Sequence, residues 1–108
     1  MKRLKFEVSL LPLILTGKKT ATWRLDDDKD LQEGDVVEFV RADKLEVFAR
    51  AKLTRVIEKP FGELTDEEKE GHEEYESEEE LFKTFSGYYD RPVDKETVFK
   101  IAKYQLLE

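Results

Sequence analysis

The segment at residues 14 to 24 gathers the side chains whose types and spacing could do chemistry. It reads Ile-Leu-Thr-Gly-Lys-Lys-Thr-Ala-Thr-Trp-Arg, so two lysines directly follow a glycine. Thr20, Thr22 and Arg24 then lie two residues apart, which places them on one face of a strand. If that face is half-buried, two hydroxyls and a guanidinium point into one cleft, where they can orient a phosphate or a carbonyl edge. Alternatively, this polar face is exposed to solvent and the opposite face supplies the core.

The two lysines, Lys18 and Lys19, also admit two interpretations. A lysine whose pKa is lowered by burial and by neighbouring cations can act as a neutral base or nucleophile toward an amide carbonyl. Alternatively, both lysines interact with the carbonyl end of the preceding helix, where cations are favoured.

Aromatic residues offer weaker candidates for binding. Trp23, Tyr88 and Tyr89 could stack on a nucleobase, although aromatic rings in a small domain more often belong to the core. His72 lies in an acidic stretch, where we expect an exposed side chain with no catalytic role.

Composition excludes several chemistries. Cysteine is absent and there is one histidine, which rules out disulfides and thiolate zinc sites and argues against catalysis by Cys or a Ser-His pair. The glutamate-rich run lacks the loop glycine and alternating oxygen ligands of a calcium-binding hand. We therefore expect no metal and no organic cofactor.

Charge is distributed unevenly along the chain. The net charge of -7 argues against broad, non-specific binding to nucleic acid. Residues 1 to 24 nevertheless carry six basic residues and one acidic residue, whereas residues 61 to 80 carry eleven acidic residues against Lys69 alone. If the fold segregates these stretches, one face can still attract a small anionic ligand.

The chain has 108 residues, the ordinary size of one domain, so we expect a single domain over residues 1–108. The apolar run at residues 8 to 15 is too short to span a bilayer, and no signal-peptide pattern opens the chain. We expect a cytoplasmic monomer without membrane association. Charged residues make up 42% of the chain and asparagine is absent, which is typical of heat-adapted proteins.

Hydrophobic periodicity predicts the elements that position these residues. Alternating or β-branched stretches predict strands at residues 2–8, 20–25, 36–40, 47–57 and 97–107. In the long fourth strand we expect one apolar face to run from Val47 to Ile57. Helical spacing predicts a short helix at residues 10–15 that Gly17 ends in a left-handed conformation.

Two further helices are predicted from their starts. Thr65 with Glu68, and Ser77 with a glutamate three residues later, are typical of helix N-termini. Residues 87 to 92, which include Gly87 and a proline, are expected to form a loop.

The pattern Gly-Lys-Lys-Thr-x-Thr-x-Arg after an apolar helix, followed by a Gly-Asp turn and a valine-rich strand, resembles the signature of the ASCH family. The resemblance extends through the acidic helices to the last strand and so covers nearly the whole chain. It implies a PUA-like fold that binds RNA, in a cleft lined by the Gly-Lys loop and the strand after it. The implied ligand-binding residues are Gly17, Lys18, Thr20, Trp23 and Arg24.

Small amidohydrolases of this family remove the acetyl group from N-acetylcytidine with a lysine, a threonine three residues later and a later glutamate. Carried over by motif, the lysine is Lys19 and the threonine is Thr22. The spacing from the following helix start favours Glu74 as the glutamate, whereas a Glu-Gly-aromatic pattern matched on Tyr75 favours Glu73. The roles implied are a base or nucleophile, an oxyanion donor and a proton shuttle.

Together these patterns predict an α+β domain with a PUA-like β-barrel of about five to six strands and flanking short helices. The function that we expect is binding of RNA or a modified nucleoside in a cleft lined by Lys, Thr and Arg. Two alternatives stay open: an amidohydrolase that deacetylates N-acetylcytidine-type nucleosides, and an acidic protein-interaction module.

Overall fold

The computed structural model describes residues 1–26 and 28–107, in which strands dominate and the helices are mostly short. In chain order the elements are β1 (Arg3–Phe6), η1 (Val8–Leu10), α1 (Leu11–Leu15), β2 (Ala21–Arg24), β3 (Val36–Arg41), β4 (Val47–Pro60), η2 (Phe61–Glu63), α2 (Asp66–Lys69), α3 (Glu78–Tyr89) and β5 (Val98–Leu107). Among the described residues, no helix is both long and apolar enough to cross a membrane.

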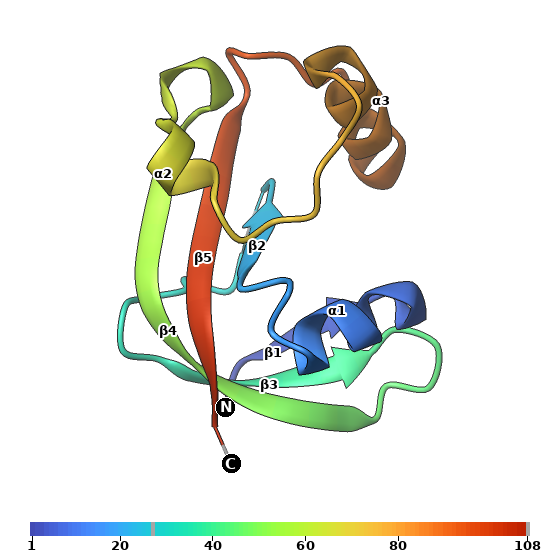
Figure 1. Ribbon diagram of the computed structural model, residues 1–108, viewed down its shortest axis with the longest axis vertical. Helices are drawn as coiled ribbons and strands as arrows, with labels where there is room; N and C mark the ends of the chain where they lie inside the picture. The colour runs from blue at the N-terminus through green and yellow to red at the C-terminus, as the bar shows by residue number, and fades with distance from the viewer. Residues whose placement is uncertain (27, 108) are drawn as a thin grey trace.

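A single curled sheet organises the molecule. Its strand order is β1-β3-β4-β5-β2, with β1 parallel to β3 and the other neighbours antiparallel. Figure 1 shows β4 bending strongly, so that the sheet folds into a half-barrel with α1 and α3 beside it. The predicted α+β class and PUA-like barrel are confirmed, with five strands in the described part of the chain.

A β-bulge in β4 corrects one expectation from the sequence. Pairing with β5 shifts between Leu53 and Arg55, so Thr54 is an extra residue without a register partner among the described residues. An extra residue reverses the alternation of faces along the rest of the strand. Leu53 consequently packs in one core cluster and Ile57 in another, and the prediction that they share a face is wrong.

The apolar interior consists of two clusters. The first lies around β1, β3 and α1 and includes Leu4, Phe6, Ile14, Phe39, Leu53 and Tyr104. The second lies around β2 and α3 and includes Ala21, Trp23, Ile57, Phe61, Phe85, Phe99 and Ile101. β2 therefore contributes core residues from one face, which leaves its other face for polar side chains.

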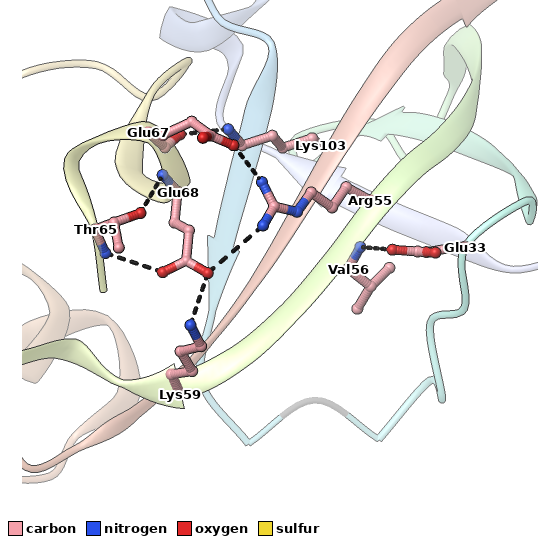
Figure 2. A network of polar contacts seen from close by, with 8 residues as sticks. All are labelled: Glu33, Arg55, Val56, Lys59, Thr65, Glu67, Glu68 and Lys103. Atoms are coloured by element: carbon pink, nitrogen blue, oxygen red, sulfur yellow. Dashed lines mark hydrogen bonds and ion pairs between the residues drawn. The ribbon is translucent and has the colours of Figure 1, made fainter. Parts of the chain in front are cut away.

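Both predicted helix starts are confirmed. Thr65 and Glu68 form a capping box at α2, and the Ser77 side chain accepts from the backbone N–H of Glu80 at α3. Figure 2 shows that the same Glu68 carboxylate also meets Lys59, at 2.8 Å, and Arg55, at 3.7 Å, both on β4. The capping box thus also ties α2 to the sheet, which fixes the start of the segment that leads on to α3.

α3 is longer than the sequence predicts, because residues 87 to 89, expected in a loop, continue the helix to Tyr89. The ring of Tyr89 stacks on that of Phe85 one turn earlier, with centroids 6.3 Å apart. Such packing outweighs the cost of about 1 kcal/mol for a glycine inside a helix. The helix ends instead at Asp90, whose backbone is left-handed, with φ 51.

Candidate functional site

A cleft of about 390 Å³ opens where the two edge strands of the sheet, β1 and β2, approach each other. It extends from η1 to α3 and to the segment at residues 70–77 between α2 and α3. The residues that line it are Lys5, Phe6, Glu7, Leu10, Lys19, Thr22, Trp23, Arg24, Ala42, His72, Glu73, Tyr75, Phe85, Tyr88 and Tyr89.

Lys19 lies against the deep wall of this cleft and is only 3% exposed. The turn at Gly17, with φ +80, brings the chain back so that the Lys19 N–H donates to the carbonyl of Leu13. The hydroxyl of Tyr104 donates to the Lys19 carbonyl at 2.7 Å. These backbone contacts fix the lysine stem, and its Nζ meets Glu73 Oε2 at 2.7 Å.

Glu73 lies close to Lys19 because Gly71, two residues before it, is hydrogen-bonded to the start of β2. The Gly71 carbonyl accepts from the N–H groups of Thr20 and Ala21, at 2.7 and 3.1 Å. Gly71 has φ +93, and a Cβ built there would lie 2.3 Å from Thr20 Oγ1. Only glycine allows this approach without a shift of neighbouring atoms.

The choice between the two candidate glutamates, left open by the sequence, follows from this loop. Glu73 projects into the cleft and pairs with Lys19, whereas Glu74 is exposed and lines a second, smaller hollow of about 300 Å³. Both residues lie in the non-helical connection between α2 and α3.

The expectation of an exposed histidine is wrong, since the His72 side chain is 4% exposed. Its ring stacks on the indole of Trp23, with centroids 4.0 Å apart and an interplanar angle of 20°. Its Nδ1 lies 2.9 Å from the Glu73 carbonyl and its Nε2 lies 3.4 Å from Glu73 Oε1. One sequence signal could have pointed to it: the sole histidine directly precedes the glutamate that the family pattern favours.

The predicted site residues in and just before β2 separate into two groups. Thr22 is buried and Arg24 half-buried, and both line the cleft. Thr20 is exposed and lies outside the cleft lining, as do Gly17 and Lys18. Of the predicted ligand-binding and catalytic residues, the fold therefore brings together Lys19, Thr22, Trp23, Arg24 and Glu73.

Arg24 also connects the two edges of the sheet. Its Nη2 donates to the carbonyl of Lys5 on β1 at 3.0 Å, and its guanidinium lies 5.2 Å from the ring centroid of Phe6. The side chain thereby joins the two edge strands beside the cleft and places a second cation close to Lys19.

The electrostatics of the site follow from burial and from these close charges. Burial lowers the pKa of the Lys19 ammonium, the pairing with Glu73 opposes that shift, and Arg24 adds to it. Burial disfavours the charged form of Glu73, yet the charge that the His72 ring carries when protonated, together with the Lys19 ammonium, keeps the pKa of the Glu73 carboxyl below the ordinary value. Burial, and then the Lys19 charge, lowers the pKa of His72 to about 4.

Aromatic rings form the remaining walls. Trp23 is 8% exposed, belongs to the second core cluster and also lines the cleft, so the core interpretation is confirmed and stacking on a base stays a prediction. Tyr88 is 65% exposed at the edge of the cleft, and the Tyr75 ring is stacked at 5.8 Å from His72. A planar ligand could pack against these faces. Within the described residues, no group of His, Asp and Glu is arranged to hold a metal ion.

The acidic and basic stretches of the sequence meet at the cleft. Residues 70–77, within the acidic stretch, cross beside the start of β2 (Figure 1), and the Lys19–Glu73 pair joins the two stretches inside the cleft. The cleft therefore contains fixed charges of both signs.

Comparisons with known proteins add the fold relationship. No family model and no curated protein matches the sequence. Among solved structures, a DUF984 protein from Enterococcus faecalis is 17% identical, with a TM-score of 0.72 over 92% of this chain and 70% of that one. An ASCH domain from Lactobacillus crispatus is 13% identical, with a TM-score of 0.64 over 91% of this chain and 70% of that one. A variant of ZmASCH from Zymomonas mobilis is 14% identical, with a TM-score of 0.64 over 98% of this chain and 66% of that one.

Proposed function

Since this chain has the ASCH-domain fold, we propose that its cleft binds one nucleoside, free or as a single exposed base of an RNA. The observation that carries this proposal is the pair formed by buried Lys19 and half-buried Glu73 in a cleft of about 390 Å³ with aromatic walls. Such a cleft supplies donor and acceptor groups for the edge of a base and apolar faces for its plane.

Size and charge favour a small ligand over a long RNA. A cleft of this volume is within the ordinary range for small-molecule sites. A long polyanion would pass close to the acidic residues on α2, α3 and the segment between them, within a chain of net charge -7. A modified nucleoside therefore suits the charge distribution better than an extended strand.

The fluorescence of Trp23, the sole tryptophan, provides the binding assay, because its ring lines the cleft. Titration of the protein with cytidine and N-acetylcytidine is expected to give a saturable change. Lys19→Met should weaken binding about tenfold or more, as expected for loss of a charge-assisted hydrogen bond. Lys18→Met is the matched control, because Lys18 is adjacent but exposed outside the cleft. Equal affinity in the two variants would count against the proposal.

Hydrolysis of an amide on the bound nucleoside is the second candidate. The observation that favours it is that Thr22 lines the same cleft as the Lys19–Glu73 pair, as the amidohydrolase resemblance requires. Transfer of one proton across the 2.7 Å contact converts ammonium and carboxylate into amine and carboxylic acid. The lowered pKa of Lys19 favours this step, whereas the lowered pKa of Glu73 opposes it.

The reaction then balances with water as co-reactant. Water adds its oxygen to the acyl carbon and gives a proton to the Lys19 amine, while the Thr22 hydroxyl donates a hydrogen bond to the oxyanion. The C–N bond breaks, and the Glu73 carboxylic acid protonates the leaving nitrogen. The products are a free amine and a carboxylic acid, and the Lys19–Glu73 ion pair is restored.

Release of acetate from N-acetylcytidine tests this second candidate. We expect release by the wild type and by Lys18→Met, and a loss of at least a hundredfold in Lys19→Met and Glu73→Gln, which is the usual scale for acid–base groups. If nucleosides bind but no acetate forms, binding stands and hydrolysis is rejected.

A further inference from the structure

The ring of His72 is held in one orientation. It lies against Trp23, with centroids 4.0 Å apart, and Tyr75 stacks nearby at 5.8 Å with an interplanar angle of 22°. Its side chain is 4% exposed, so packing restricts rotation of the ring. The two ring nitrogens therefore have fixed neighbours.

Those neighbours determine the tautomer. His72 Nδ1 lies 2.9 Å from the backbone carbonyl of Glu73, and a carbonyl can only accept, so Nδ1 carries the hydrogen. A neutral imidazole has one N–H, which leaves a lone pair on Nε2. Burial and the nearby Lys19 ammonium disfavour a second proton and Glu73 favours it, and the balance lowers the pKa of the ring to about 4.

The lone pair of His72 Nε2 lies beside a second acceptor. Glu73 Oε1 is 3.4 Å away, while the other carboxylate oxygen, Oε2, accepts from Lys19. Two adjacent acceptors repel each other, and a donor hydrogen shared between them is attracted to both. Both residues line the cleft.

We propose that His72 Nε2 and Glu73 Oε1 form a paired acceptor that selects ligands bearing an N–H group, such as an amino or secondary amide group on the ring. This inference rests on the proposed nucleoside binding. The Lys19 ammonium is a donor beside this paired acceptor. Together they match the edge of a base on which an N–H group, bound by the paired acceptor, lies next to a ring nitrogen or a carbonyl, bound by Lys19. His72 is thereby a specificity-determining residue that sequence patterns do not mark.

A matched pair of ligands tests the proposal through Trp23 fluorescence. Cytidine carries an amino group, and 2-pyrimidinone riboside has hydrogen in its place and adds no bulk. We expect the wild type to prefer cytidine about tenfold. His72→Phe keeps an aromatic ring on Trp23 but removes Nε2, and should reduce the preference to about threefold or less. Glu74→Gln, with its side chain outside the cleft, should keep it.

A measurement on the ligand-free wild type tests the proposal even if His72→Phe folds poorly. His72 is the sole histidine, so ¹⁵N NMR of the wild type reports its tautomer directly. We expect a protonated Nδ1 and an unprotonated Nε2 at neutral pH. A proton on Nε2 would overturn the paired acceptor whatever the binding data.

The results of the binding assay distinguish failure of the proposed selection for N–H groups from failure of the proposed nucleoside binding. Equal affinity of the wild type for the two ligands, or an unchanged preference in His72→Phe, overturns the selection of N–H groups and leaves nucleoside binding intact. Failure of both ligands to bind rejects the proposed function, and this inference with it.

Discussion

Burial of a single histidine should make stability depend on pH. The pKa of His72 is about 4 in the folded chain, against roughly 6.5 when it is exposed to water. Between these values the unfolded chain binds a proton that the folded chain does not, so the free energy of unfolding falls as pH drops through this window. The loss should be on the order of 3 kcal/mol by pH 4, since one pKa unit corresponds to about 1.4 kcal/mol.

Urea denaturation of the wild type and His72→Phe at several pH values isolates this effect, because the variant keeps every carboxylate. We expect the wild type to lose more stability than the variant between pH 7 and pH 4.5. Parallel curves for the two proteins would show that His72 is not held neutral by burial.

At the residue scale, part of the cleft lining could be predicted from sequence. Lys19 and Thr22 both line the cleft, and a short motif fixes their spacing within one local segment. The choice of Glu73 over Glu74 could not be made, because it depends on how Gly71 docks on β2. The burial of His72 depends on its stacking against Trp23, a partner distant in sequence.

At the scale of elements, the segment at residues 70–77 is the one that builds the site, and Gly71 is its anchor. Gly71→Ala adds a Cβ 2.3 Å from Thr20 Oγ1 at a position with φ +93. We expect a loss of about 1–3 kcal/mol in stability, together with weaker nucleoside binding as Glu73 is displaced.

Gly87→Ala is the matched control, since Gly87 lies in α3 with nothing within 4 Å of an added Cβ. This change should raise stability by about 0.5–1 kcal/mol, because alanine is the better helix former. Thermal melts of both variants check the pair. If the melting temperatures of Gly71→Ala and Gly87→Ala shifted in the same direction, the result would contradict the steric role of Gly71.

Elements with strong local signals were predicted well. The capping residues Thr65 and Ser77 mark both helix starts, because a cap is a contact between near neighbours. The bulge at Thr54 and the extension of α3 to Tyr89 were missed. Both depend on packing across the sheet and along the helix, which overrides local turn and alternation patterns.

At the scale of the whole molecule, the curled sheet explains where the cleft lies. Its two edge strands, β1 and β2, belong to sequence segments that are close in the chain but are separated in the sheet by β3, β4 and β5. The contact from Arg24 to the Lys5 carbonyl connects these edges beside the cleft. The α+β class with a curled sheet was predictable from the order of elements, and the resemblance to the ASCH family implied the PUA-like fold. The meeting of acidic and basic stretches inside the cleft was not predictable, because charge counts carry no spatial information.

The central claim is that the cleft around Lys19 and Glu73 is the ligand site. Its most direct test is an NMR titration of ¹⁵N-labelled protein with cytidine. We predict saturable shifts at the amides of Thr22, Glu73 and Tyr88 and at the indole N–H of Trp23, with little change around the Glu68 network of Figure 2. Shifts that gather at that network, or no saturable shift in the cleft, would contradict the account.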